Sequence, residues 1–364
     1  MIYKGIKLHN VAELEQREHL NGVILHRFPA EVRHSLSDKG RTKAVQSNSC
    51  ELRFVTESAS IRVTVSAYGS SGKVLVFCGD FFHSSHSLQA GAITTLNLEV
   101  PDRFVQVHEE VLRNQAFSPR VWRIFFDRFT AVFHDIDAYG HEIREPHRDE
   151  VPKLAFVAYG SSITHGAGAL SHYNGYTQQA ARRMETDVLN LGLSGSCLCE
   201  PEVADFIAGR SDWDFAFFEL GVNMRSVLTV NEFEHRIKYL LDRVISRHPD
   251  KPVFITTIYP NRATYFKAED DRMAVNEHQF NEVLRQYAAQ KRHGKLHLFE
   301  GSEIMTDFTS LTSDLIHPSD YGHILMGEKL AALIRPILQR TGMEQQTFAK
   351  MDDSLRGGES HKRS

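Results

Sequence analysis

The stretch "GSSITHGAGA" at residues 160–169 follows an apolar run and is rich in glycine, serine and threonine. Such a loop either binds phosphate through its backbone N–H groups or carries a nucleophilic serine. A phosphate-binding loop of the Walker type requires a lysine directly before a serine or threonine, and residues 160–175 contain no lysine. A dinucleotide-binding loop requires three glycines at fixed offsets, which Gly160, Gly166 and Gly168 do not match. The residues therefore favour a nucleophilic serine.

A nucleophilic serine requires a base, an acid that orients the base, and hydrogen-bond donors for the oxyanion. Three further short motifs supply such groups. The segment "GLSGS" offers the backbone N–H of Gly195, and "ELGVN" offers the side-chain amide of Asn223. The segment "SDLIHP" contains Asp314 and His317. We expect these groups to meet the serine loop where all four motifs lie at one edge of a sheet.

The second part of the chain supplies such an edge. Five short apolar runs predict strands buried on both faces of a parallel sheet, at residues 153–160, 187–193, 214–221, 252–260 and 295–300. Helical stretches lie between them, and the apolar stripe of residues 231–248 is typical of an amphipathic helix. This alternation predicts a doubly wound parallel sheet, in which ligands bind beyond the carboxyl ends of the strands. The serine loop begins where the first strand ends.

The first part of the chain has a different pattern. Short segments alternate apolar and polar residues with the period of a strand covered on one side, at residues 51–58, 60–67, 73–78, 92–100 and 121–133. They predict an antiparallel β-sandwich of jelly-roll-like type. A charged stretch with two prolines, residues 140–153, marks the junction. The predicted organisation is a sandwich domain at 1–148, a catalytic domain at 149–342 and a polar tail at 343–364.

The composition excludes several classes of partner. The 42 Lys and Arg residues nearly balance the 46 Asp and Glu residues, which argues against nucleic acid as a partner. No apolar run is long enough for a membrane span, and the N-terminal residues lack the pattern of a secretory signal. The four cysteines are few for the length and suit a reducing compartment, so we expect a cytoplasmic protein.

Four blocks of the sequence resemble those of the GDSL or SGNH hydrolases, in the order found in that family. They are "YGSSIT", "NLGLSG", "ELGVN" and "DLIHP", within residues 156–318. The resemblance implies a flavodoxin-like α/β domain that hydrolyses esters without a cofactor or metal.

Carried over to this sequence, the resemblance implies that Ser162 is the nucleophile, His317 the general base and Asp314 its orienting partner. The oxyanion hole would consist of the backbone N–H groups of Ser162 and Gly195 and the amide of Asn223. The chain departs from the family pattern at two positions. Ser161 replaces the usual aspartate before the nucleophile, and Met224 stands where aspartate is frequent. Neither position is needed for the proton relay, so we expect the two departures to bear on the subfamily and on local hydrogen bonding more than on the chemistry.

Several residues have a structural interpretation beside the functional one. Asp320 and His323 repeat the acid-x-x-His spacing, but their segment predicts a helix capped by Ser319. Ser162 itself has the alternative role of a helix N-cap. Tyr173 and Tyr176 either bind substrate by stacking on a sugar ring or pack the first helix against the sheet.

Two pairs of residues could in principle bind metal or act as nucleophiles, but we expect structural roles for both. His83 and His86 have a spacing that can bind metal, but no further pair accompanies them, and we expect a surface loop. Cys197 and Cys199 lie near the serine loop in the predicted sheet, and we expect them to be buried apolar groups.

The order of a β-sandwich and a GDSL-type domain resembles carbohydrate esterases that remove acetyl groups from plant polysaccharides. This resemblance implies a serine esterase for short acyl groups, with an acetylated oligosaccharide or another small ester as substrate. Two alternatives remain at this point. One is a lysophospholipase or thioesterase on the same scaffold, and the other is a carbohydrate-binding protein with an inactive hydrolase domain.

Overall fold

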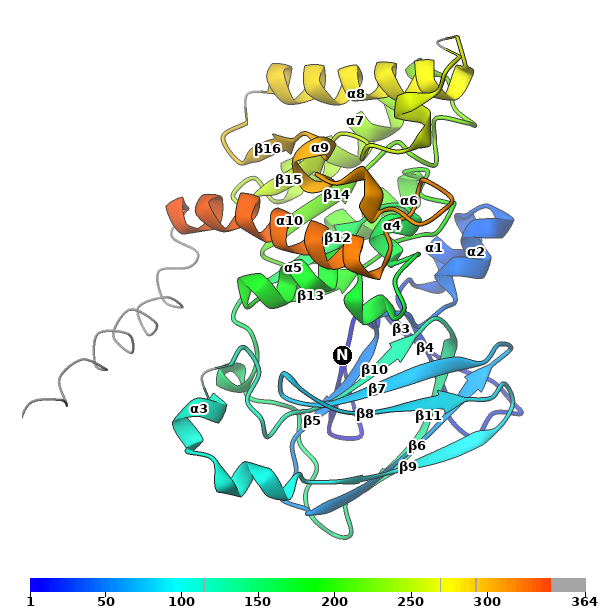
Figure 1. Cartoon of the computed structure of the whole chain (residues 1–364). Coiled ribbons are helices and arrows are strands. Elements are labelled where there is room, and N and C mark those ends of the chain that lie inside the picture. The colour runs from blue at the N-terminus through cyan, green and yellow to red at the C-terminus, as the bar shows by residue number, and fades with distance from the viewer. Residues whose placement is uncertain (114, 269, 292, 342–364) are drawn as a thin grey trace, which may run out of the picture.

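The computed structural model describes residues 1–341 apart from 114, 269 and 292. An antiparallel half lies below a parallel α/β half in the view of Figure 1. This architecture confirms the predicted fold classes. The predicted tail at 343–364 lies outside the described residues. Among the described helices, none combines the length and apolar composition that a membrane crossing requires.

The antiparallel half consists of two facing sheets. One has the order β1 (Ile2–Tyr3), β2 (Ile6–His9), β5 (Glu51–Phe54), β10 (Trp122–Asp127), β7 (Gly72–Cys78) and β8 (Phe81–Leu88). The other has the order β3 (Glu13–Gln16), β4 (Val23–His26), β11 (Thr130–Asp137), β6 (Ser60–Tyr68) and β9 (Ile93–Glu99). Alternation builds the core between them: on β6, Ile61, Val63 and Val65 are buried while Arg62 is exposed.

Two details differ from the expectations for this half. Residues 121–133 form two strands, β10 and β11, which a tight turn joins. Arg128 in that turn has a φ of 69°, a left-handed conformation that apolar patterning does not reveal. The residues expected as a surface loop around His83 and His86 form strand β8, which pairs with β7. Their many small polar residues conceal this edge strand.

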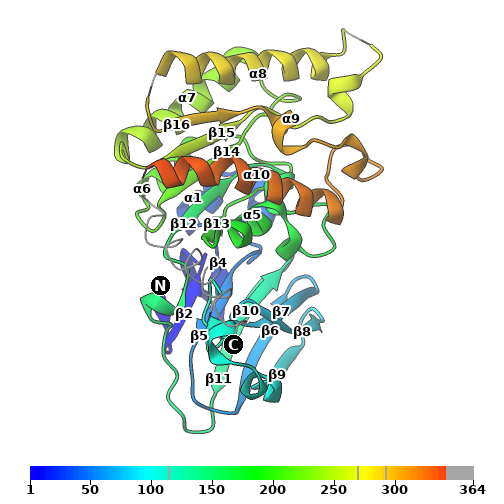
Figure 2. The same ribbon diagram turned by 60° about the vertical axis from the view of Figure 1, so that its left-hand side comes forward.

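The parallel sheet has the order β13 (Asp187–Asn190), β12 (Ala155–Tyr159), β14 (Phe215–Glu219), β15 (Val253–Thr256) and β16 (Leu296–Phe299). In chain order this is 2-1-3-4-5, the flavodoxin-like arrangement. One face packs against α6 (Pro201–Gly209), α7 (Val230–Arg247) and α8 (Arg272–Lys291). The other face packs against α5 (Tyr176–Met184), α9 (Gly301–Ile304) and α10 (Asp320–Arg340). Figure 2 shows α10 crossing in front of the sheet.

Local sequence fixes the ends of the main helices. The predicted helix at 231–248 is α7, which begins with a capping box between Thr229 and Glu232. Helix α10 begins as predicted, with the Ser319 side chain accepting a hydrogen bond from the backbone N–H of Gly322. The remaining helices are short: α1 (Ala30–Ser35), α2 (Asp38–Ala44), α3 (Glu109–Arg113) and α4 (Ser162–His165).

The N-terminal segment at residues 27–44 packs against the parallel half, not against the sandwich core. Phe28, Val32 and Leu36 belong to the apolar cluster of the parallel sheet, and the Phe28 and Phe206 rings lie 5.8 Å apart. The buried Arg27 donates to the carbonyl oxygens of residues 190 and 192, at 3.1 and 3.0 Å. The segment therefore fixes the loop that follows β13. The predicted boundary near residue 148 stays a prediction.

A buried ionic cluster also joins the two halves. Arg53 on β5 donates to both oxygens of Asp187 at the start of β13. Its Nε lies 2.7 Å from Glu51, whose carboxylate also receives two hydrogen bonds from Arg123. Burial would raise the pKa of Glu51, but the two arginines outweigh burial and lower it. The charges are paired, as groups buried at such a junction must be.

Candidate active site

Ser162 lies where β12, an interior strand of the parallel sheet, turns into the short helix α4. Its Oγ is 2.8 Å from Nε2 of His317, and 8% of the residue is exposed. The helix N-cap is Ser161, whose side chain accepts a hydrogen bond from the N–H of Ile163. The alternative role of Ser162 as N-cap is therefore wrong, because Ser162 is the first helical residue. Its hydroxyl is left to bond with the imidazole.

His317 and Asp314 lie on the loop before α10. Nδ1 of His317 is 2.7 Å from Oδ2 of Asp314. A carboxylate only accepts hydrogen bonds, so Nδ1 carries the proton and Nε2 is free to accept from Ser162. Burial would raise the pKa of Asp314, but hydrogen bonds from the side chain and N–H of His317 and the N–H of Ile316 lower it well below its ordinary value. Asp314 is thus an anion positioned to orient the base.

The two other predicted groups follow the strands on either side of β12. Gly195 follows β13 and Asn223 follows β14, the two neighbours of β12 in the sheet. The side-chain oxygen of Asn223 accepts a hydrogen bond from the N–H of Cys197 at 3.2 Å, which leaves the amide N–H groups available. Within the described residues, no acceptor binds the backbone N–H of Ser162 or Gly195. Three sets of donors are therefore available on the elements around the serine.

Glu219, the last residue of β14, is a buried acid behind the nucleophile that the sequence interpretation missed. One of its oxygens accepts hydrogen bonds from the N–H and hydroxyl of Ser161, at 2.7 and 2.6 Å. The same oxygen accepts from the Thr164 hydroxyl at 3.1 Å. Burial raises the pKa of Glu219 to about 7, although these hydrogen bonds act in the opposite direction. The signal was available in "DFAFFELG", where this acid ends an otherwise apolar strand.

The two departures from the family pattern have distinct structural roles. Ser161 supplies a hydroxyl donor to the Glu219 carboxylate. Gly160 leaves space for this contact, because a Cβ there would lie 2.7 Å from the carboxylate oxygen of Glu219 and 2.3 Å from the Thr164 hydroxyl. Met224 is fully buried in the apolar cluster of the parallel half. The first departure therefore acts on hydrogen bonding behind the nucleophile, and the second on packing.

The predicted substrate contacts of Tyr173 and Tyr176 are not supported by their positions. Tyr176 is fully buried, and its hydroxyl is 2.7 Å from that of Thr164. The Tyr173 ring packs against the Phe77 and Phe125 rings of the antiparallel half, with centroid distances of 4.5 and 5.5 Å. Tyr176 takes the packing role that was the alternative, because its ring lies in the apolar cluster between α5, α10 and the parallel sheet. Tyr173 packs on the antiparallel half instead, a contact that neither interpretation includes.

The second acid-x-x-His pair has structural contacts. Asp320 accepts hydrogen bonds from the N–H of Leu170 and the side chain of Asn174. His323 is buried on α10, and its Nε2 is 2.9 Å from the carbonyl oxygen of Ala167. This pair therefore supports the segment that follows the nucleophile.

Among the described residues, neither the cysteine thiols nor the β8 histidines contact Ser162, His317 or Asp314. Cys197 and Cys199 are buried, and burial raises the pKa of the Cys197 thiol. His83 and His86 both lie within hydrogen-bond distance of the Ser84 hydroxyl between them. The part of the chain that the structure describes contains no group of three metal-ligating side chains.

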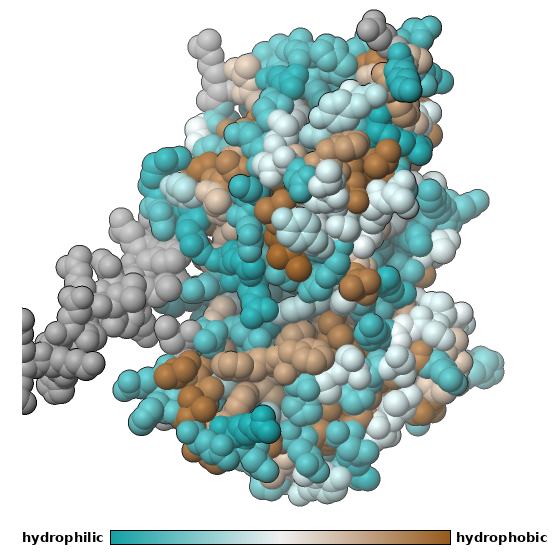
Figure 3. Space-filling view, in the orientation of Figure 1, coloured by the Kyte–Doolittle hydropathy of each residue, from teal (hydrophilic) through white to brown (hydrophobic). Residues whose placement is uncertain are grey.

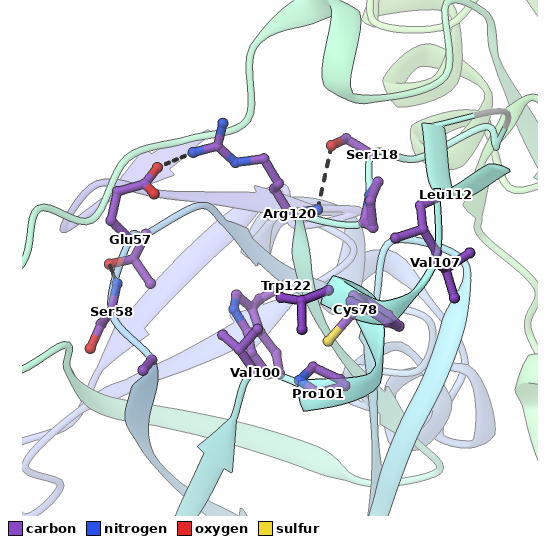
Figure 4. Close-up of a pocket in the computed structure, with 15 residues that line it drawn as sticks. Glu57, Ser58, Cys78, Val100, Pro101, Val107, Leu112, Ser118, Arg120 and Trp122 are labelled. Atoms are coloured by element: carbon purple, nitrogen blue, oxygen red, sulfur yellow. Dashed lines mark hydrogen bonds and ion pairs between the residues drawn. The ribbon is translucent and has the colours of Figure 1, made fainter. Parts of the chain in front are cut away.

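A separate cavity of about 590 Å³ opens in the antiparallel half (Figure 4). Trp122 and Cys78 lie in its lining, and an ion pair between Glu57 and Arg120 lies at one side. Figure 3 shows hydrophobic residues gathered over the nearby α3 region. Val111 on α3 and Val105 on the 3-10 helix before it are both exposed. The cavity lining does not include the Ser162 site and has no serine bonded to a histidine among its described residues. It is not the candidate reaction centre.

Comparisons with known proteins identify the family of the parallel half. The model of the GDSL-like lipase/acylhydrolase family matches residues 153–335, half of the chain. No curated protein matches the chain in sequence.

Solved structures share the whole architecture. A salicylyl-acyltransferase from a tetracycline biosynthetic pathway has 17% identity and a TM-score of 0.73, with 90% of this chain and 95% of that chain covered. A GDSL-like lipase described as putative, from Bacteroides ovatus, has 17% identity, a TM-score of 0.64 and coverage of 93% and 96%. A family two carbohydrate esterase from Clostridium thermocellum, solved with cellohexaose, has 16% identity, a TM-score of 0.61 and coverage of 92% and 99%. By the match of its second half, this chain is a hydrolase that belongs to the GDSL-like lipase/acylhydrolase family.

Proposed function

We propose that this protein is a serine esterase that uses Ser162, His317 and Asp314 to hydrolyse short acyl esters, with O-acetyl groups on small carbohydrates as substrates. The observation that carries the proposal is the continuous chain of contacts from Ser162 Oγ to His317 at 2.8 Å and from His317 to Asp314 at 2.7 Å. A serine that is bonded to an imidazole, with a carboxylate behind it, has the arrangement needed for acyl transfer.

In the first half-reaction, Nε2 of His317 takes the Ser162 proton while Oγ attacks the ester carbonyl carbon. The negative charge on the carbonyl oxygen is met by the N–H groups of Ser162 and Gly195 and by the Asn223 amide. The tetrahedral intermediate then collapses, and His317 gives its proton to the departing alcohol. In the second half-reaction, His317 deprotonates water, which attacks the acyl-enzyme and releases the carboxylic acid.

The choice of substrate rests on the whole-chain architecture. The sandwich and the hydrolase half occur together in the family two carbohydrate esterase, which covers 92% of this chain. This shared architecture supports a carbohydrate ester as the substrate. A small acetylated oligosaccharide or glycoside is the substrate we propose.

The first test compares hydrolysis of p-nitrophenyl acetate, butyrate and octanoate by the wild type, Ser162→Ala and His317→Ala. We expect the acetate to be the best substrate and each substitution to lower kcat by about 10³-fold or more. Ser313→Ala is the matched control, because Ser313 is an exposed serine next to Asp314. Circular dichroism must show that all four proteins are folded.

The outcomes separate the three candidate functions. Activity on acetate that both substitutions abolish supports the esterase and justifies assays with acetylated sugars. Rates that rise with acyl length would favour a lysophospholipase or thioesterase on the same residues. A wild type no faster than Ser162→Ala on every ester would reject the esterase, and sugar binding unaffected by that substitution would favour a binding protein.

A further inference from the structure

Helix α2, which comes from the N-terminal part of the chain, packs directly on the loop that carries Gly195. The hydroxyls of Ser37 and Ser196 lie 3.0 Å apart. A Cβ at Gly40 would lie 2.6 Å from the Ser196 hydroxyl, so the helix backbone approaches this loop closely. Through this contact, the face of α2 that carries Lys39 and Gly40 lies next to the Gly195 loop.

Lys39 extends from this helix over Gly195. A Cβ built on Gly195 would lie 2.3 Å from Nζ of Lys39 and 2.4 Å from its Cε. The Gly195 φ of 66° also favours glycine. The ammonium group therefore occupies the position next to the Gly195 backbone that a side chain would fill in any other residue.

The charge of Lys39 is not neutralised by a neighbouring acid. Within the described residues, Lys39 has no ion pair or hydrogen bond, whereas Arg41 on the same helix pairs with Asp38. The acids of the site are also engaged: Asp314 with His317, and Glu219 with Ser161.

Two further cations are carried by elements that flank the nucleophile. Lys43 lies one helical turn after Lys39. Burial is the main reason that the pKa of His165 is lowered, and the positive charge of Lys43 lowers it further. Arg128 donates to the carbonyl oxygens of Ala169 and Leu170, on the segment after α4. Helix α2 and the β10–β11 turn thus both contribute positive charge around the serine loop.

We propose that Lys39 binds a carboxylate of the substrate, so that the enzyme prefers esters carrying a negative charge near the ester group. This inference rests on the proposed esterase function and names a substrate class for it. A flexible ammonium at the edge of the oxyanion site attracts such a charge without taking part in the proton relay. The carboxylate belongs either to the acyl part or to the alcohol part of the ester, and the test includes one pair of probes for each.

The test uses pairs of esters that differ in one negative charge. For the alcohol part, 4-acetoxybenzoate is compared with its neutral methyl ester, with release of acetate as the readout. For the acyl part, methyl hydrogen succinate is compared with dimethyl succinate. The measured quantity is the ratio of kcat/KM for the anionic ester to that for the neutral ester, with kcat and KM determined separately.

We expect the ratio for at least one pair to fall about tenfold in Lys39→Gln, mainly through KM. Lys39→Arg keeps the charge and should retain most of the preference. Lys43→Gln is the matched control, because it removes the same charge from the same helix, and it should change the ratio by less than about twofold. The wild-type preference should also weaken as salt rises from about 20 to about 500 mM.

Two results would overturn the inference while leaving the esterase intact. In the first, the wild type hydrolyses neutral esters but shows no preference in either pair that depends on Lys39. In the second, Lys39→Gln slows the anionic and neutral esters equally, which would place Lys39 in loop positioning or oxyanion stabilisation. A wild type that hydrolyses none of the esters would instead reject the esterase function and the inference together.

Discussion

The two sides of the candidate site are held in place in different ways. The nucleophile side, with Ser161, Ser162 and Glu219, is buried at the carboxyl ends of the central strands. The base side lies in an exposed loop, where the side chains of His317 and Asp314 are 28% and 46% exposed. The sheet core therefore positions the serine, whereas the base depends on the local conformation of its own loop.

Hydrogen bonds within the chain hold that exposed loop. The N–H of Thr312 donates to the carbonyl oxygen of His317 at 2.8 Å, and the N–H of Leu315 donates to that of Thr312 at 2.9 Å. The N–H of Arg262 donates to the carbonyl oxygen of Leu315 at 2.7 Å. Substitutions on the base side should therefore reduce activity with little effect on stability, and substitutions behind the nucleophile should reduce stability.

The largest effect should come from Asp314→Asn on the base side. The asparagine oxygen can still accept the backbone hydrogen bonds of the loop, but its amide group cannot accept the Nδ1 proton as well, so the imidazole loses its orientation. We expect kcat to fall about 10³- to 10⁴-fold with a nearly unchanged melting temperature.

Asp320→Asn tests whether this effect is specific, because Asp320 belongs to the second acid-x-x-His pair. This control should keep kcat within about threefold of the wild type. Equal losses in the two variants would mean that the assignment of Asp314 as the orienting acid is wrong.

The next effect concerns stability on the nucleophile side. Glu219→Ala would leave the buried N–H and hydroxyl groups of Ser161 and the Thr164 hydroxyl without their acceptor. We expect the free energy of unfolding, measured in urea, to fall by about 3 kcal/mol. Glu99→Ala is the matched control, since Glu99 is an exposed glutamate at the end of β9, and it should change stability by less than about 0.5 kcal/mol. Similar stabilities of the two variants would contradict the view that buried hydrogen bonds hold the nucleophile side in place.

The smallest effect is a dependence of stability on pH. Glu219 has a pKa of about 7 in the folded protein, which is above the pKa of a glutamate in the unfolded chain. At pH values between these two pKa values, the folded state therefore binds one more proton than the unfolded state. The free energy of unfolding should therefore decrease as pH rises from about 4.5 to 7, by roughly 2–3 kcal/mol from this group. Glu219→Gln cannot titrate and should lack this component. Urea unfolding of both proteins at about pH 5, 6 and 7 measures the difference, and parallel pH profiles would count against it.

The sequence supports much of the architecture and the order of the site motifs. Apolar runs predict all five parallel strands, because strands buried on both faces have a simple pattern. The motifs containing Ser162, Gly195, Asn223 and His317 all lie beyond strand ends, where a doubly wound sheet brings distant segments together.

Other features depend on contacts between segments that no local pattern reveals. Strand β8 is polar along most of its length, and its assignment depends on pairing with β7. Burial of Tyr176 depends on the docking of α10 against α5. The position of Lys39 depends on the packing of α2 against the Gly195 loop, more than 150 positions further along the chain.

Because α1 packs against α6, it cannot reach its final packing until α6 has been synthesised. Phe28, Val32 and Leu36 leave the ribosome early, but their partner helix α6 begins roughly 170 residues later, at Pro201. At cellular translation rates of about 5–20 residues per second, this interval is on the order of 10–30 s. During that time the nascent chain carries an apolar segment without its final partner, so its capture by chaperones or by a neighbouring chain competes with folding.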